Sequence, residues 1–184
     1  MVEVKSITLP LNDEVIASLH SGDNVLLTGT MLTGRDAAHQ KLLELIKQGK
    51  PLPVDIAGQA IFYVGPTPAR PGNPIGSAGP TTSNRMDSFT PELHRLGLKA
   101  TIGKGSRGPE VRDALCRYKA VYLAVTGGAA ALISRAIKKS EVVAYPELGP
   151  EAIRMLEVVD FPAIVVNDMY GNDLYEEGRA RFQA

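Results

Sequence analysis

The sequence predicts an α/β domain built on a mixed sheet. Up to about residue 140, short β-rich runs alternate with segments of helical periodicity, the order that gives parallel strands joined by helices. The last part alternates in the period of a strand and holds a tight turn at Tyr170–Asp173, as terminal hairpins do. With 184 residues and no internal repeat, the chain is expected to form a single domain over residues 1–184.

Local signals place the elements of the first half. Asn12 can cap a short helix, with Asp13 and Glu14 favourable in its first turn. A second helix has one apolar face and is closed by Gly49 and Pro51. The strands are predicted at 4–9, 25–33 and 60–64, and the helices at 13–19 and 36–47.

The second half continues the pattern. Pro109 stands at the first position of a helix, where its missing N–H does no harm. Gly127-Gly128 leads into an alanine-rich helix. Another helix is expected near 91–96, and strands are expected at 98–102, 120–125, 142–144, 155–159 and 163–166, followed by a charged tail.

Residues 65–85 form the long connection of the chain. This stretch has five prolines, four glycines and no usable periodicity. A structureless stretch of about 20 residues within a compact domain is usually functional or disordered. Because of its length and because the sequence at both ends has the pattern of ordered structure, we expect it to be functional.

Composition excludes several classes of protein. Twenty basic and twenty acidic residues cancel, which argues against a general nucleic-acid binder and against a membrane-surface protein. No apolar run reaches the roughly 18 residues of a membrane span. The first residues lack the apolar core of a signal peptide, and one cysteine cannot form an internal disulfide, so a cytoplasmic location is expected.

Several motifs resemble cofactor, metal or nucleophile sites but lack residues or spacings that such sites require. Gly103–Gly108 fits the dinucleotide pattern G-x-G-x-x-G, but the acidic residue expected about 20 positions on is missing. An anion site at this turn, with Lys104 beside a helix N-terminus, is the weaker inference that survives. The three histidines lack metal-site spacing, His39 is most simply a helix-face residue, and Cys116 is expected to be a buried, inert thiol. No metal site is therefore predicted in this chain.

Three turns that follow strands carry a cation beside glycine or hydroxyl groups. They are Thr33-Gly34-Arg35-Asp36, Thr81-Thr82-Ser83-Asn84-Arg85 and Gly103-Lys104-Gly105. Loops at strand ends tend to converge on one crevice. The planar fork of arginine pairs bidentately with a carboxylate, so two arginines indicate a small dicarboxylate ligand. With one cysteine available, the sequence indicates half of an active site whose metal or redox half lies on another polypeptide.

The ordered motifs resemble the class I fumarase family. They are Thr-Gly-Arg-Asp-x-Ala-His (33–39), Phe-Tyr-Val-Gly-Pro (62–66), Gly-Pro-Thr-Thr-x-x-Arg-Met-Asp (79–87) and Gly-Lys-Gly (103–105). Thr-Gly-Gly-Ala-Ala-Ala (126–131), Val-x-Asp-Phe-Pro-Ala (158–163) and Gly-Asn-Asp (171–173) continue the series. The chain is similar to the β subunit, or C-terminal domain, of iron–sulfur fumarases and of the related L-tartrate dehydratase.

This resemblance implies a three-layer β/β/α swivelling domain and a reversible hydro-lyase reaction between L-malate and fumarate. It implies Thr81 as the base, Lys104 as a further catalytic cation, Thr82 as a substrate contact, and Arg35 and Arg85 as carboxylate clamps. It also implies a partner α subunit that carries a 4Fe–4S cluster, in an α₂β₂ assembly. This chain cannot hold such a cluster itself, because several thiolates are needed and it has one.

Two alternatives remain open at this stage. The chain could be the β subunit of L-tartrate dehydratase, since both substrates are four-carbon 2-hydroxy diacids. It could also be a non-catalytic dicarboxylate-binding module that kept the pocket without its partner. The retention of all four polar blocks favours the enzyme subunit.

Overall fold

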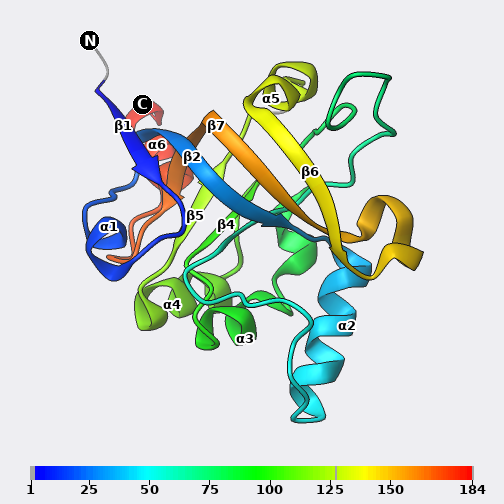
Figure 1. The fold of residues 1–184 in the computed structure, drawn as a ribbon. Helices are drawn as coiled ribbons and strands as arrows, with labels where there is room; N and C mark the ends of the chain where they lie inside the picture. Colours follow the sequence, from blue (N-terminus) through cyan, green and yellow to red (C-terminus); the bar gives the residue numbers. More distant parts are fainter. Residues whose placement is uncertain (1–2, 127, 184) are drawn as a thin grey trace.

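A computed structural model describes residues 3–126 and 128–183 (Figure 1). Within them, one mixed sheet of seven strands is accompanied by helices, which confirms the predicted α/β class. The strands are β1 (Val4–Thr8), β2 (Asn24–Thr33), β3 (Ala60–Phe62), β4 (Ala100–Gly103), β5 (Val121–Ala124), β6 (Ile137–Ala144) and β7 (Ile153–Asn167).

The sheet closes on itself. Strands β1 to β5 are parallel neighbours in chain order, and β7 runs antiparallel to β5. β7 also pairs antiparallel with β2 from Asn24↔Ile164 to Leu32↔Met155, so β2, β3, β4, β5 and β7 form a ring. β6 extends the sheet beside β7. All the parallel strands of the ring therefore end at the same edge.

The helices are mostly short and surround the ring. In Figure 1, α2, α3 and α4 lie together on the lower side of the sheet, whereas α5 lies at the top. The helices are α1 (Asp13–Ala17), α2 (Asp36–Lys47), α3 (Thr90–Arg95), α4 (Pro109–Tyr118), α5 (Ala130–Ala136) and α6 (Leu174–Phe182), with 3₁₀ turns η1 (Ser83–Met86) and η2 (Pro146–Glu151).

Strand alternation divides the buried side chains into layers. Phe62, Leu123 and Phe161 belong to the largest hydrophobic cluster, which fills the ring. Their neighbours Ile61 and Tyr122 face outward and join clusters covered by the helices. Two β layers with a helical layer outside agree with the expected β/β/α arrangement.

Most predicted elements lie within a few residues of their observed bounds. Asn12 caps α1 as expected, its side chain accepting a hydrogen bond from the Val15 amide at 2.9 Å. The helix predicted at 36–47 has those bounds. The alanine-rich helix begins at Ala130. Gly127, the first residue of the Gly127-Gly128 pair expected to precede this helix, lies outside the described residues.

The C-terminal part is where the prediction was wrong. The two strands expected at 155–159 and 163–166 are one strand, β7, and the charged tail forms helix α6. β7 passes through Pro162, which pairs with Leu26 of β2 and, within the described residues, with neither β5 nor β6. Proline is tolerated there because the missing N–H leaves no ladder bond unmade on that side.

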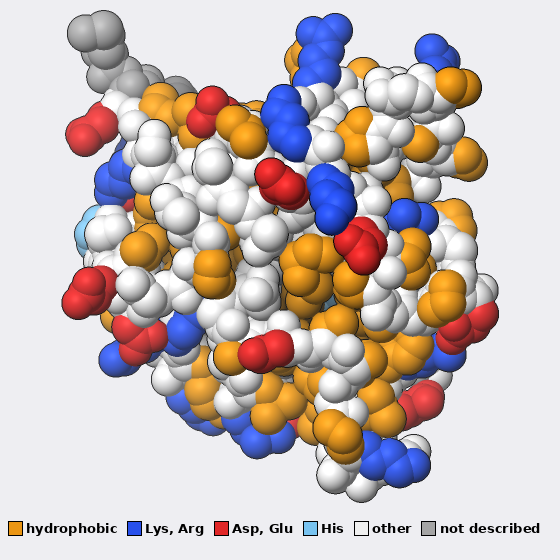
Figure 2. Space-filling model, in the orientation of Figure 1, with side chains coloured by type: hydrophobic (Ala, Val, Ile, Leu, Met, Phe, Trp, Pro, Cys, Tyr) orange, Lys and Arg blue, Asp and Glu red, His pale blue; other side chains and the backbone are white. Residues whose placement is uncertain are grey.

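Residues 66–79 form the long connection without helix or strand, and Figure 1 shows it beside the start of β6. Its two arms are joined by hydrogen bonds between Thr67 and Ser77. The Ala78 amide donates to the Ala130 carbonyl at 3.3 Å, which ties the loop to α5. On the face seen in Figure 2, basic and acidic side chains are interspersed with hydrophobic ones, as expected from equal totals of the two charges.

Phe161 offers a test of ring closure. Its ring contacts that of Phe62, on the opposite wall, edge to face at 5.2 Å between centroids, and both are fully buried. We expect Phe161→Ala to lower the free energy of unfolding by about 3–5 kcal/mol in urea titrations. The exposed neighbour Val159 on the same strand is the control, and Val159→Ala should change it by less than about 0.5 kcal/mol. Equal effects of the two substitutions would contradict this description of the core.

Candidate functional site

Arg35 lies where β2 ends and α2 begins. The Gly34 amide donates to the Phe62 carbonyl at 3.2 Å, which holds this turn against the end of β3. The Arg35 guanidinium crosses the backbone at Gly65, where a Cβ atom would lie 2.7 Å from Nη1. Glycine at position 65 therefore makes room for the half-buried arginine.

Two acidic side chains hold the two arginines of the site. Asp36 accepts from Arg85 in bidentate form, from Nε at 3.0 Å and from Nη2 at 2.9 Å, and its Oδ2 lies 3.5 Å from Arg35 Nε. Glu151 accepts from the Ala37 amide at 2.8 Å and lies 3.3 Å from Arg35 Nη2. Asp36 also occupies the first turn of α2, where the helix dipole favours a negative charge.

Thr81, Thr82 and Lys104 are adjacent at the ends of β3 and β4. The Thr81 amide donates to the Tyr63 carbonyl at 2.7 Å. Thr82 and Lys104 form a parallel bridge, in which the Ser83 amide donates to the Lys104 carbonyl at 2.8 Å and the Lys104 amide donates to the Thr81 carbonyl at 3.3 Å. The segment after the long loop thus continues the sheet between two strand ends.

The five residues expected at the site therefore gather at one edge of the sheet, beyond the carboxyl ends of β2, β3 and β4. They form two groups, one with Thr81, Thr82 and Lys104 and one in which Asp36 joins the two arginines. Thr82, Arg85 and Lys104 are exposed, while Arg35 and Thr81 are half-buried. The convergence expected of loops at strand ends is present, and the assigned roles stay predictions.

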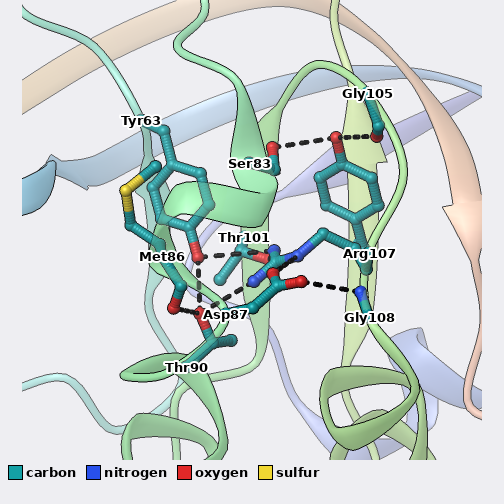
Figure 3. Close-up of polar contacts among 10 residues, drawn as sticks. Tyr63, Ser83, Met86, Asp87, Thr90, Thr101, Gly105, Arg107 and Gly108 are labelled. Carbon is teal, nitrogen blue, oxygen red and sulfur yellow. Dashed lines mark hydrogen bonds and ion pairs between the residues drawn. The ribbon is translucent and has the colours of Figure 1, made fainter.

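A buried arginine lies beneath this edge (Figure 3). The side chain of Arg107 is 0% exposed, and its Nε donates to Asp87 Oδ1 at 2.7 Å. Nη1 donates to Thr101 Oγ1 at 2.9 Å and to the Tyr63 hydroxyl at 3.4 Å, and Nη2 donates to Thr90 Oγ1 at 2.8 Å. Burial opposes the charged form, but Tyr63 and Asp87 outweigh it and raise the pKa of Arg107, so the guanidinium stays charged.

The turn expected to hold an anion is filled by the chain itself. The Gly108 amide, at the start of α4, donates to Asp87 Oδ2 at 2.7 Å. Asp87 thus pairs with both the buried guanidinium and the helix N-terminus, so this amide is not free for a ligand.

The hydroxyl group of Tyr122 makes a second set of polar contacts near those of Arg107. The Tyr122 hydroxyl donates to the Gly105 carbonyl at 2.8 Å, so the Ser83 hydroxyl, 2.9 Å away, donates to Tyr122. A Cβ atom on Gly103 would overlap the Ser83 Oγ. Glycine at position 103 is therefore what lets Ser83 approach the end of β4.

His39 lies on the buried side of α2 and supports the backbone of Arg35. Its Nδ1 is 2.9 Å from the Arg35 carbonyl, which can only accept, so the proton is on Nδ1. The ring contacts Tyr63 edge to face at 5.3 Å between centroids. Burial, aided by the charge of Arg107, lowers the pKa of His39 to about 4, so this histidine is neutral at physiological pH.

The expectation that Cys116 is buried was wrong. Its side chain is exposed on the outer side of α4, because the buried positions of that helix are Val111, Ala114 and Leu115. Partial desolvation and the carboxylates of Asp168 and Asp113 raise the pKa of the thiol, which disfavours the reactive thiolate. Among residues 3–126 and 128–183, no three His, Cys, Asp or Glu side chains gather in a way that could hold a metal ion. No helix in those ranges is long and apolar enough to cross a bilayer.

Sequence reasoning missed four residues that shape this edge. Glu151 lies 114 positions from Ala37, whose amide donates a hydrogen bond to it, and no local pattern links the two. Tyr122 reads as one more residue of a buried strand. Arg107 lies inside the motif Gly103–Gly108, and Asp87 ends the motif at 79–87. The signal that could have found them was the presence of one more charged residue in each of these motifs.

Comparisons with known proteins agree with these motifs. The sequence model of the family described as "Fumarase C-terminus" matches residues 1–178. "Fumarate hydratase class I, anaerobic" of Escherichia coli is 44% identical over 169 residues, 89% of this chain and 31% of that protein. "Fumarate hydratase 2" of Leishmania major is 41% identical over 158 residues, 85% of this chain and 28% of that protein.

A third relative is of similar size to this chain. "L(+)-tartrate dehydratase subunit beta" of Escherichia coli is 37% identical over 183 residues, 97% of this chain and 90% of that protein. The chain therefore spans less than a third of the length of the two fumarate hydratases (31% and 28%) and nearly all of the tartrate dehydratase subunit.

Two buried histidines should make the fold sensitive to acid. Burial lowers the pKa of His94, like that of His39, to about 4 from an ordinary 6.5. Between these values the unfolded chain binds protons that the folded chain does not, so stability is fully present above pH 6.5 and falls toward pH 4. Each histidine should cost about 2 kcal/mol of unfolding free energy between pH 8 and pH 5.

The measurement is urea unfolding at pH 8 and at pH 5. Asparagine can donate to the same carbonyl that each Nδ1 contacts, yet it does not titrate. His94→Asn should therefore lose about 2 kcal/mol less than wild type over this pH range, and His39→Asn should behave in the same way. An unchanged pH dependence in both variants would show that these histidines are not buried in neutral form.

Proposed function

Since this chain belongs to the fumarase C-terminus family, we propose that it acts as the β subunit of a two-subunit hydro-lyase that interconverts L-malate and fumarate. The observation that carries this proposal is the convergence of Thr81, Thr82 and Lys104 with Arg35 and Arg85 at one edge of the sheet. Three cations and two hydroxyl groups, of which Thr82, Arg85 and Lys104 are exposed, suit a small dicarboxylate.

The reaction explains why these residue types are needed. Dehydration of a 2-hydroxy diacid removes hydroxide from one carbon and a weakly acidic proton from its neighbour. Loss of the proton builds negative charge on the adjacent carboxylate, which cations placed beforehand stabilise. Arg35 and Arg85 would hold the two carboxylates, and Thr82 would contact the substrate.

Thr81 would take the proton. A threonine hydroxyl is a poor base at its ordinary pKa and requires nearby positive charge to favour the deprotonated form. Lys104 and Arg85 are the candidate cations for this, and the Lys104 amide donates to the Thr81 carbonyl at 3.3 Å. Lys104 would also stabilise the charge that develops on the substrate.

The remaining chemistry requires a partner. The residues of this chain do not fit an iron–sulfur cluster, since such clusters take several cysteine thiolates and Cys116 is the single cysteine. A 4Fe–4S cluster on an α subunit would supply a Lewis acid for the departing hydroxyl. The exposure of Thr82, Arg85 and Lys104 supports a site completed by that subunit. We further propose an α₂β₂ assembly and a cytoplasmic location.

Tartrate is the second candidate substrate. The match with this chain covers 90% of the Escherichia coli tartrate dehydratase β subunit. It covers only 31% of the Escherichia coli fumarate hydratase. L-Tartrate differs from L-malate by one hydroxyl, so the same residues could serve both. A non-catalytic dicarboxylate-binding module is the reading that remains if neither is turned over.

The experiment is anaerobic reconstitution. The chain is combined with its cluster-bearing partner, and dehydration of L-malate and L-tartrate is compared, with each chain alone as a control. Turnover of malate in the mixture only supports the proposal. Preference for tartrate keeps the mechanism and changes the substrate. Binding of a diacid without turnover, when the cluster is intact, would replace the enzyme by the binding module.

Thr81→Ala tests the base. Half-buried Thr81 is fixed by its backbone, through the Tyr63 carbonyl at 2.7 Å, so the substitution should change unfolding free energy by less than about 1 kcal/mol. Turnover of the assembled enzyme should fall by about a hundredfold or more, since proton transfer to a positioned group is lost. Activity above about a tenth of wild type would remove Thr81 from the mechanism.

Arg85→Lys tests the carboxylate clamp. Lysine retains the charge but lacks the planar fork, and it cannot reproduce the bidentate pair with Asp36 at 3.0 and 2.9 Å. KM for the diacid should rise by about tenfold or more, as the loss of a charge-assisted hydrogen bond predicts. Steady-state kinetics of the assembled enzyme measure this, and an unchanged KM would contradict the role.

A further inference from the structure

Arg107 is a buried cation that the proposed reaction does not use. A buried ion pair is weak evidence for stability, since well-packed apolar residues often serve a core equally well. The Arg107 guanidinium instead makes four side-chain hydrogen bonds and lies 5.4 Å from the ring centroid of Tyr63 and 5.0 Å from that of Tyr122. Because every nitrogen of this guanidinium is hydrogen-bonded, the group fixes the relative positions of the segments that it touches.

Those segments are the ones that carry the site. Asp87 ends the turn that holds Arg85, and Tyr63 is the residue whose carbonyl accepts from the Thr81 amide. Arg107 itself belongs to the turn that begins with Lys104. One guanidinium therefore joins the segment after the long loop to the turn after β4, as its contacts with Asp87 and Tyr63 in Figure 3 show.

The Tyr122 hydroxyl makes the same connection at a second point. It accepts from Ser83, which follows Thr82, and donates to the carbonyl of Gly105, which follows Lys104. Tyr122, Ser83 and the Arg107 side chain are each 0% exposed, so solvent cannot replace these contacts.

The carboxylate clamp is held by other means. Arg85 is paired to Asp36 in α2, and Arg35 lies against Glu151 of η2. Neither ion pair includes Arg107 or Tyr122. A change in this network should therefore alter the spacing of Thr81 and Lys104 more than the position of Arg85, which Asp36 of α2 also holds.

We propose that Arg107 and Tyr122 are positioning residues that set the spacing of Thr81 relative to Lys104. The inference rests on the proposed function, in which Thr81 takes the proton and Lys104 stabilises the charge. It assigns turnover, rather than substrate affinity, to the buried network. Arginine is required because lysine lacks the fork that reaches Asp87, Thr90 and Thr101 at once.

The first measurement is steady-state kinetics of the assembled enzyme with Arg107→Lys and Tyr122→Phe. Displacement of reacting groups by about 1 Å can lower turnover by about a hundredfold. We expect kcat to fall by about thirtyfold in Arg107→Lys and about fivefold in Tyr122→Phe, with KM within about threefold of wild type. Tyr122→Phe removes one oxygen atom and keeps the ring, so it tests the proposal even if Arg107→Lys does not fold.

The second measurement does not depend on activity. Hydrogen–deuterium exchange of the assembled protein, followed by mass spectrometry, reports on residues 79–87 and 101–108. In both variants, exchange in these peptides should be faster than in wild type, and this increase should exceed any increase in the other peptides. Ile16→Val or Ile16→Ala, in α1, is the control, chosen to match the loss of melting temperature. The control should have the kcat of wild type, and exchange in its two peptides should stay as slow as in wild type.

The outcomes separate this inference from the proposed function. A fall in kcat without a change in KM, together with local exchange, supports positioning. Loss of activity in proportion to melting temperature in variants and control alike, with uniform exchange, would overturn it, as would wild-type kcat in both variants. If wild type turns over neither diacid, the proposed function fails, and the exchange pattern alone still decides whether the network holds the two segments.

Discussion

The antiparallel pairing of β2 with β7 is the constraint on which the rest of the molecule depends. It converts an open sheet into a ring, whose interior is filled by one hydrophobic cluster. Within this ring β2, β3 and β4 are parallel neighbours, so their carboxyl ends lie at a common edge, where the turns that follow them meet. The site is thus a consequence of sheet topology, and its side chains come from turns whose backbones are hydrogen-bonded to the strand ends.

Charge is balanced locally at this edge. Arg35, Arg85 and Lys104 are offset by Asp36 and Glu151, which leaves a small positive excess. The carboxylates are partly shielded, whereas the outer cations face solvent, where salt screens them. Beneath the surface, Arg107 and Asp87 form an ion pair with no net charge. This pair holds the two segments together but adds no net charge to the site.

Much of this arrangement could be predicted from the sequence, because periodicity and caps are local. The helix at 36–47 and the gathering of Arg35, Thr81, Arg85 and Lys104 followed from strand order and turn chemistry. The strand through Pro162 could not be predicted, since its single neighbour there depends on the whole sheet. Glu151 and Tyr122 were missed for the same reason, as both act through contacts distant in the sequence.

The pairing of Arg85 with Asp36 has a consequence for the entropy of ligand binding. A free arginine side chain carries about 2 kcal/mol of rotamer entropy, which a ligand normally removes when it immobilises the chain. Here Asp36 has already immobilised Arg85 through Nε and Nη2. A diacid that reaches the remaining end of the guanidinium, at Nη1, meets a preorganised donor and keeps more of the contact energy as affinity.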